Sequence, residues 1–347
     1  MLRTQSEDLE IPQKSNTAMP ENAPPHYFRP HIPHNCRRAK FHNYKAPGTY
    51  MISFNKSDDI PDFSYIIGDI RSSANPPCTT LTAIGEIINS KIIEIDQMPE
   101  FEIPNHVIMP DHIHLLWKVK EWLPRDLGHY VAYLKAKATA LWHESFGIDS
   151  SASLFAPKFN DKISFDEAMT KRFSNYISDN PRRRLTVLTH PELFDRAHRV
   201  RILDKEMDFY GNFQLLKHPV IAAAVVSSRY TAAERQYYES AWEEAIRTQG
   251  VLVSPFISEA EKTLMRRGIE SGASIIRIIP DGIGPKYKPS GQEFDLCAQG
   301  RCLHIGPPRQ SSHTDAIKRD YCLSLNKVAY WIASHPAERM TLIQRKD

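Results

Sequence analysis

Two histidines one residue apart interrupt an apolar run, HVIMPDHIHLLW, at residues 106–117. Side chains alternate faces along a β-strand, so His112 and His114 point the same way while Ile113 points to the opposite face. Two imidazoles on one face can bind a single metal ion. A pair of surface histidines that only form hydrogen bonds is the alternative, but it explains poorly why both lie among Ile, Leu and Trp. The spacing therefore predicts a two-histidine metal site.

A tyrosine and an asparagine further along the chain could complete this site, in RFSNYISDNPRRRL at residues 172–185. On a helix, Tyr176 and Asn180 are four residues apart and share a face. A carboxamide oxygen is a reasonable third ligand for a hard divalent ion, which favours Mg²⁺ or Mn²⁺ with open positions for phosphate oxygens. The metal would polarise a phosphodiester, and the Tyr176 phenol oxygen could attack it to form a phosphotyrosine.

Taken separately, Tyr176 is better interpreted as a core-facing residue and Asn180 as a helix-ending residue. Only in combination with the histidine pair is the catalytic interpretation the stronger one. A free phenol titrates near pH ~10, and the sequence shows no obvious general base for it. The densest basic run follows directly, and beside a nuclease centre we expect Arg182, Arg183 and Arg184 to contact phosphates. A helix next to the strand pair could also offer Lys135 and Lys137 to phosphates, although both could simply be solvated.

The two motifs together, VIMPDHIHLL and NYISDNP, resemble those of the HUH single-tyrosine transposases, which include the transposases of small insertion sequences and the REP-associated tyrosine transposases. HUH denotes histidine, a bulky hydrophobic residue and histidine, here residues 112–114. The aspartate before the pair is common in the insertion-sequence branch, whereas a tyrosine followed by Asn-Pro is closer to the REP-associated branch. The resemblance covers roughly residues 46–235.

This resemblance implies a ferredoxin-like α+β fold, with the histidines on an antiparallel sheet and the nucleophile on a nearby helix. Such proteins cleave single-stranded DNA, often near hairpins, leave a 5′-phosphotyrosine and a free 3′-OH, and rejoin strands. It therefore implies that Tyr176 is catalytic, that His112, His114 and Asn180 bind Mg²⁺ or Mn²⁺, and that the partner is single-stranded DNA, hairpins included. The site is often shared across subunits, so we expect a homodimer.

Composition and periodicity divide the chain into a flexible basic arm at 1–45, a middle segment at 46–249 and a Rossmann-like α/β domain at 250–347. The resemblance implies that the middle segment is the transposase domain. The arm could bind zinc, but its histidine and cysteine spacings match no standard pattern, and phosphate contact is favoured; the residues concerned are His31, His34, Cys36 and His42. The C-terminal domain lacks a GxGxxG or GxxxxGK loop.

Periodicity also predicts the elements that must position these residues. A helix from Phe165 should stop before Pro181, because the residue preceding proline is disfavoured in the helical region. The junction at 254–258 could hold an anion at a helix N-terminus, although a structural cap is the favoured interpretation. The remaining predicted strands are 50–55, 101–109, 112–119, 198–203, 209–216, 251–258, 274–280 and 302–308, and the remaining helices are 81–95, 123–147, 232–248, 258–272 and 321–334.

The overall composition is that of a globular protein of 347 residues with a net charge of +3, which by itself does not argue for nucleic acid. Five cysteines without a tight CxxC pair favour reduced thiols in the cytoplasm. The chain shows no apolar run that could span a bilayer and no secretory signal, so we expect no membrane association.

We therefore expect a metal-dependent transposase or endonuclease. The alternative is a domesticated, catalytically silent DNA-binding protein of the same fold. A third interpretation, a metallohydrolase with water as nucleophile, needs a carboxylate base. Asp111 is the only adjacent one, and strand alternation aims it away from the metal face.

Overall fold

The computed structural model describes residues 39, 42–148, 151–309 and 319–342. The predicted arm at 1–45 therefore lies largely outside the described residues, together with three of its four candidate zinc ligands. The fourth, His42, is described, and its Nε2 atom forms a 2.8 Å hydrogen bond with the hydroxyl of Tyr50.

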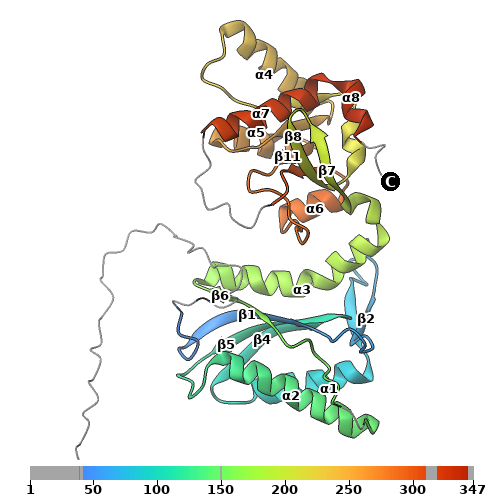
Figure 1. The fold of residues 1–347 in the computed structure, drawn as a ribbon, viewed down its shortest axis with the longest axis vertical. Helices are drawn as coiled ribbons and strands as arrows, with labels where there is room; N and C mark the ends of the chain where they lie inside the picture. The colour runs from blue at the N-terminus through green and yellow to red at the C-terminus, as the bar shows by residue number, and fades with distance from the viewer. Residues whose placement is uncertain (1–38, 40–41, 149–150, 310–318, 343–347) are drawn as a thin grey trace, which may run out of the picture.

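The first unit is built on a four-stranded antiparallel sheet with helices on both faces (Figure 1). Its strand order, β4-β5-β1-β6, combined with the chain order β-α-β-β-α-β, is that of a ferredoxin-like fold. The predicted α+β fold is confirmed. Its elements are β1 (Gly48–Asn55), a hairpin of β2 (Ser64–Ile67) and β3 (Cys78–Leu81), α1 (Ala83–Asp96), β4 (Phe101–Ile108), β5 (His112–Val119), α2 (Leu127–Phe146), β6 (Asn160–Ser164) and α3 (Glu167–Thr189).

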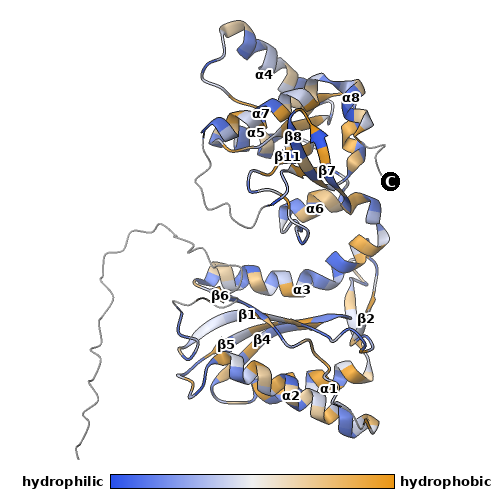
Figure 2. Cartoon of the chain, viewed as in Figure 1, coloured by the Kyte–Doolittle hydropathy of each residue, from blue (hydrophilic) through white to orange (hydrophobic). Residues whose placement is uncertain are grey.

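Strand alternation divides this sheet into two different faces. Side chains from alternate positions of β1 and β5, with Trp117 at the centre, pack against α1 and α2 in a large apolar core. The opposite face, which α3 covers, holds a smaller cluster that includes Met51, Leu116 and Ile177. Figure 2 colours much of α3 as hydrophilic, whereas α1 and α2 carry more hydrophobic colour. The histidines, at even positions of β5, share the α3 face with Leu116.

The helix α3 does not end before Pro181 as predicted, but continues to Thr189 with Pro181 inside it. An interior proline removes a helical hydrogen bond and costs about 3 kcal/mol. Contacts on both sides of Pro181 offset this cost: Ile177 is fully buried against the sheet, and Arg182 forms an ion pair with Asp295 in the second unit. A local sequence signal is overridden here by tertiary packing.

Ile177 offers a direct test of how α3 is held on the sheet. We expect Ile177→Ala to lower the free energy of unfolding by about 2–5 kcal/mol, because it removes a buried apolar side chain and leaves a cavity. Leu188→Ala on the same helix is the matched control, since Leu188 is 57% exposed and such a change usually stays within about 0.5 kcal/mol. Denaturant unfolding measures both, and equal effects would contradict the described packing.

The second unit contains a six-stranded sheet in the order β7-β8-β12-β11-β10-β9. The strands β9 to β12 are parallel, and β8 pairs antiparallel with β12. One face packs against α4, α5 and α6, and the other against α7. The elements are β7 (Asp195–Ile202), β8 (Lys205–Gly211), β9 (Ile221–Ala223), α4 (Ala232–Arg247), β10 (Val251–Ser254), α5 (Glu259–Glu270), β11 (Ser274–Ile278), α6 (Gln292–Ala298), β12 (Cys302–Gly306), α7 (Arg319–Ser334) and α8 (Pro336–Thr341), with short 3-10 helices at Pro191–Phe194 and Phe213–Lys217.

The second unit begins before the predicted domain boundary at residue 250. The strands β7, β8 and β9 precede that position but hydrogen-bond into the second sheet, and these pairings cannot be read from local composition. The predicted parallel α/β core is present in β9 to β12. Its strand order is sequential, without the reversal that defines a doubly wound Rossmann sheet, so the Rossmann-like assignment stays a prediction.

Two further expectations concern the helices of the described ranges. The helix α5 begins with the predicted capping box, in which the buried Glu261 carboxylate accepts hydrogen bonds from the backbone N–H groups of Ile257 and Ser258. The structural cap is therefore the correct interpretation of this junction. Within the described ranges, no helix combines the length and the apolar character needed to cross a membrane.

Candidate active site

The two histidines lie side by side at the start of β5, on the face that α3 covers. Their ring centroids are 4.8 Å apart. Pairing of β5 with β1 places His114 opposite Ser53 and His112 opposite Asn55. His114 is 8% exposed, whereas His112 is more accessible. The predicted juxtaposition of the two imidazoles is thus present, with one ring buried and the other at the rim.

Each imidazole uses its Nδ1 atom for a hydrogen bond within the protein. His112 Nδ1 donates to Asp111 Oδ1 over 2.6 Å, and His114 Nδ1 lies 2.5 Å from the hydroxyl oxygen of Ser53. Among the described residues, neither Nε2 atom has a hydrogen-bond partner. Outer hydrogen bonds of this kind fix the tautomer and the orientation of metal-binding histidines. The arrangement leaves two Nε2 lone pairs as the donor atoms of a metal site.

The position of Asp111 corrects the expectation from alternation. Asp111 lies in the turn between β4 and β5, where alternation does not apply, and its carboxylate reaches the outer nitrogen of His112. The hydrogen bond from His112 holds the pKa of Asp111 at about 2, helped by the positive charges of His112 and Arg184. A carboxylate with such a low pKa is a poor general base, which disfavours a water-activating hydrolase.

The charge state of His114 suits metal binding. Burial, together with the nearby charges of His112 and Lys162, lowers its pKa to about 3. At neutral pH the ring is therefore uncharged, which is the form that binds metals. Lys162 is exposed on β6 and shares the α3 face, because it pairs with Met51. No sequence pattern identifies Lys162, because its position beside the histidines depends on the register of β6 with β1.

Tyr176 lies next to the histidine pair in the same chain. Its ring centroid is 5.4 Å from that of His114, in an edge-to-face arrangement. Asn105 of β4 anchors the helix two residues on either side of Tyr176, because its amide donates to the side-chain oxygens of Ser174 and Ser178 over 2.9 Å each. The sheet thus fixes both the histidines and the helix that carries the tyrosine.

The predicted third ligand, Asn180, is buried one turn beyond Tyr176. Its amide nitrogen donates to the backbone carbonyl of Tyr176 over 2.7 Å, and the residue is 7% exposed. This bond uses the nitrogen, so the side-chain oxygen is the atom of Asn180 that could bind a cation.

The three arginines beyond the tyrosine have separate roles. Arg182 forms ion pairs with Asp179 and, across to α6, with Asp295 at 2.7 Å. Arg183 lies 3.8 Å from the ring centroid of Phe294 and 5.6 Å from that of Tyr176. Arg184 is exposed and close enough to Asp111 to lower its pKa. Only Arg184 keeps the exposed position expected for all three, while Arg182 and Arg183 join α3 to the second unit.

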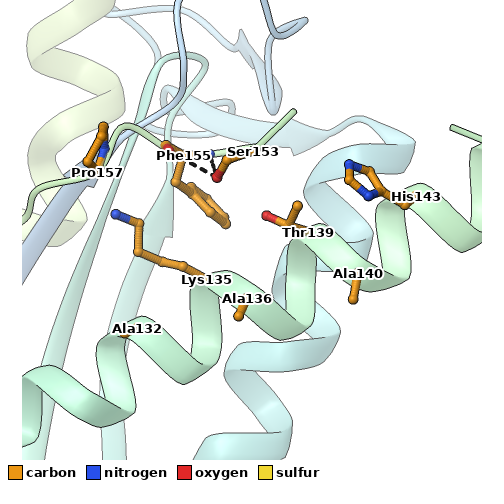
Figure 3. A pocket seen from close by; sticks show the side chains of 9 residues that line it. All are labelled: Ala132, Lys135, Ala136, Thr139, Ala140, His143, Ser153, Phe155 and Pro157. Atoms are coloured by element: carbon orange, nitrogen blue, oxygen red, sulfur yellow. Dashed lines mark hydrogen bonds between the residues drawn. The ribbon is translucent and has the colours of Figure 1, made fainter. Parts of the chain in front are cut away.

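The two lysines predicted to contact DNA lie on α2, on the opposite face of the sheet from the histidines. The Nζ atom of Lys135 donates to the carbonyl oxygen of Ala156 over 2.5 Å, and the side chain borders a shallow hollow on α2 (Figure 3). Lys137 lies over the ring of Tyr133, 5.5 Å from its centroid. Lys135 is thus buried and bonded to the backbone, and Lys137 is exposed on the face away from the histidines, so contact of either lysine with DNA stays a prediction.

Two solved structures are similar to part of this chain, and both are described as transposases. One is a REP-associated tyrosine transposase bound to a REP hairpin, with 19% identity and a TM-score of 0.29, covering 42% of this chain and 73% of that chain. The other is a candidate transposase from Deinococcus radiodurans R1, with 14% identity and a TM-score of 0.25, covering 40% of this chain and 95% of that chain. No family model and no curated protein matches the chain. Likenesses this distant leave function to be argued from the geometry of the site.

Proposed function

We propose that this protein is a metal-dependent transposase or endonuclease that cleaves and rejoins single-stranded DNA through a 5′-phosphotyrosine intermediate. The observation that carries the proposal is the arrangement within one chain of His112, His114 and Tyr176. Both imidazoles keep a free Nε2 atom, and the tyrosine ring lies 5.4 Å from the nearer imidazole. A purely structural histidine pair would not need this combination.

The donor set fits a divalent cation. Two imidazole nitrogens and the amide oxygen of Asn180 are ligands that Mn²⁺ accepts, and Mg²⁺ accepts the oxygen. When bound, such an ion supplies Lewis-acid polarisation of the scissile phosphate and orients the leaving 3′ oxygen. Asp111 and Ser53 hold the two rings in the tautomer that presents Nε2 to the ion.

Tyr176 performs the covalent step in this proposal. Its phenol oxygen loses its proton and attacks the phosphorus, a phosphotyrosine bond forms, and the bond from phosphorus to the 3′ oxygen breaks. The leaving 3′ oxygen gains a proton, so charge and atoms balance without a further reactant. Attack by a 3′-OH on the phosphotyrosine then rejoins DNA and restores the tyrosine.

Exposed cations around the histidines are suited to hold the DNA backbone. Arg184 on α3 is near Asp111 and Lys162 on β6 is near His114, where positive charge can contact phosphates. The similar REP-associated transposase is bound to a REP hairpin, and binding of hairpin-containing DNA is part of this proposal. A homodimer also stays a prediction, although one chain already holds the tyrosine near the histidines. Restored cleavage by mixed His112→Ala and Tyr176→Phe proteins would support a shared site.

The proposal is tested by incubating the protein with labelled single-stranded DNA from its own flanking sequence and Mg²⁺ or Mn²⁺. We expect a protein–DNA adduct that survives SDS, together with a free 3′-OH product. Chelation should abolish both. Cleavage without an adduct would favour a hydrolase, and binding without cleavage would favour the silent DNA-binding alternative.

Asp111 provides a test of the outer hydrogen bond. We expect Asp111→Ala to weaken Mn²⁺ binding by about 10–100-fold, since partners that orient a metal-binding histidine typically have effects of this size. Asp59→Ala, which removes an exposed carboxylate from the same unit, is the control for a simple change of charge. Calorimetric titration with Mn²⁺ measures both variants, and equal affinities would remove Asp111 from the proposed site.

A further inference from the structure

A second cluster of metal-binding side chains lies in the second unit, between α6 and β12. The Sγ atoms of Cys297 and Cys302 and a ring nitrogen of His304 all lie within 4.8 Å of one another. All three residues are at most 1% exposed. None of them takes part in the candidate active site, which lies on the first sheet.

The fold brings these three side chains together from two elements. Cys302 and His304 alternate with Leu303 along β12, so both point toward α6 while Leu303 points toward α7. Cys297 lies near the end of α6, and the N–H of Gly300 donates to its carbonyl oxygen over 2.8 Å in the turn that leads to β12. The short connection holds the helix-borne thiol against the strand.

We propose that Cys297, Cys302 and His304 bind a structural zinc ion, with Glu293 as the fourth ligand. Tetrahedral zinc with bonds of about 2.0–2.3 Å requires neighbouring ligand atoms roughly 3.3–3.8 Å apart. The Sγ atom of Cys302 is 3.3 Å from His304 Nε2, and Glu293 Oε2 is 3.8 Å from the same nitrogen. These separations match two edges of the tetrahedron, and the two-thiolate, one-imidazole set is typical of zinc.

The surroundings favour the required protonation states. Burial lowers the pKa of His304 to about 3, with a further contribution from the charge of Arg277, so the ring is neutral. The Tyr287 hydroxyl oxygen lies 3.2 Å from Nδ1, and when it accepts a hydrogen bond from Nδ1–H, Nε2 is left free for the ion. Arg277 forms an ion pair with Glu293, so two thiolates, the carboxylate, Zn²⁺ and the guanidinium sum to no net charge.

An ion is also the simplest way to stabilise thiolates here. A hydrogen bond with Cys297 and burial both raise the pKa of Cys302, so without a cation this thiol stays protonated. Zinc would displace both protons to solvent, and its binding energy would stabilise the folded unit. Zinc binding would also affect α3, because α6 carries Phe294 and Asp295, which contact Arg183 and Arg182. The zinc would fix the surface that holds the far end of the tyrosine helix.

The test is the metal content of the full chain, purified from zinc-containing medium and dialysed against zinc-free buffer. We expect one zinc per chain by elemental analysis. Two variants separate the possible locations: Cys297→Ser with Cys302→Ser should lose the ion, whereas His112→Ala with His114→Ala should keep it. A third variant replaces the other three cysteines, Cys36, Cys78 and Cys322, by serine and should also keep it.

Cobalt gives a readout that does not depend on the folding of the cysteine variant. Co²⁺ added to the metal-free protein should produce the sulfur-to-metal absorption of two thiolate ligands, and the triple serine variant should retain that absorption in full. Three results would overturn the proposal: a chain that binds no zinc and gives no thiolate absorption, zinc that is lost from the His112/His114 variant alone, or a disulfide between Cys297 and Cys302 in the freshly purified, metal-free chain.

Discussion

DNA cleavage by His112→Ala or His114→Ala protein should fall by about 10³-fold. The metal that these rings would bind supplies several kcal/mol of transition-state stabilisation, and each 1.4 kcal/mol corresponds to a factor of about ten in rate. The two variants should differ in stability, because His114 is buried against Ser53 whereas His112 lies at the rim. Cleavage of a labelled strand under single-turnover conditions measures the rate, and thermal unfolding measures the stability.

The matched control for these variants is His106→Ala. His106 lies on the neighbouring strand β4, where its Nε2 atom bonds Asn89 on the other face of the sheet, so this change should leave cleavage intact. Chelation of the wild-type protein should reproduce the loss seen in the His112 and His114 variants. Normal cleavage by a folded His112→Ala protein would exclude the metal site.

The second large effect is expected for Tyr176→Phe, which should form no covalent adduct and cleave no DNA. The substitution removes a single hydroxyl and keeps the ring that packs near His114 and Arg183. DNA binding should therefore change by less than about 1 kcal/mol. Gel-shift binding and SDS-resistant adduct formation are measured on the same DNA.

Tyrosines elsewhere in the first unit provide the comparison for Tyr176. Tyr130 packs edge-to-face on Phe101, 4.9 Å between ring centroids, and Tyr133 lies on the same helix, α2. Both lie on the face of the sheet away from the histidines, so Tyr130→Phe and Tyr133→Phe should form the adduct normally. An adduct that persists in Tyr176→Phe would assign the nucleophile to another residue.

The parts of the site that depend on local periodicity could be predicted from the sequence. Alternation along one strand places His112 and His114 together, and the motif around Tyr176 identifies a helix. The partners Ser53 and Lys162 could not be found in this way, because they reach the pair only through the register of β1 with β5 and β6. Asp111 is adjacent in sequence, yet its role depends on a turn that alternation does not describe.

Long-range contacts explain the remaining differences. The charge of the three arginines could not show that only Arg184 is exposed. Arg182 contacts Asp295 and Arg183 contacts Phe294, each more than a hundred residues away in the sequence. The same contacts keep α3 helical beyond Pro181. Lys135 on α2 is directed to the backbone of the following segment, and burial lowers its pKa. The second sheet begins at Asp195, before the predicted boundary, because of strand pairings that composition does not reveal.

The most direct test of the central claim is to identify the residue that becomes joined to DNA. The adduct formed with single-stranded DNA and Mn²⁺ is digested with nuclease and protease, and the modified peptide is sequenced by mass spectrometry. We predict a nucleotide attached through its 5′ phosphate to the phenol oxygen of Tyr176. Cleaved DNA with free 5′ phosphates and an unmodified Tyr176 peptide would contradict the account.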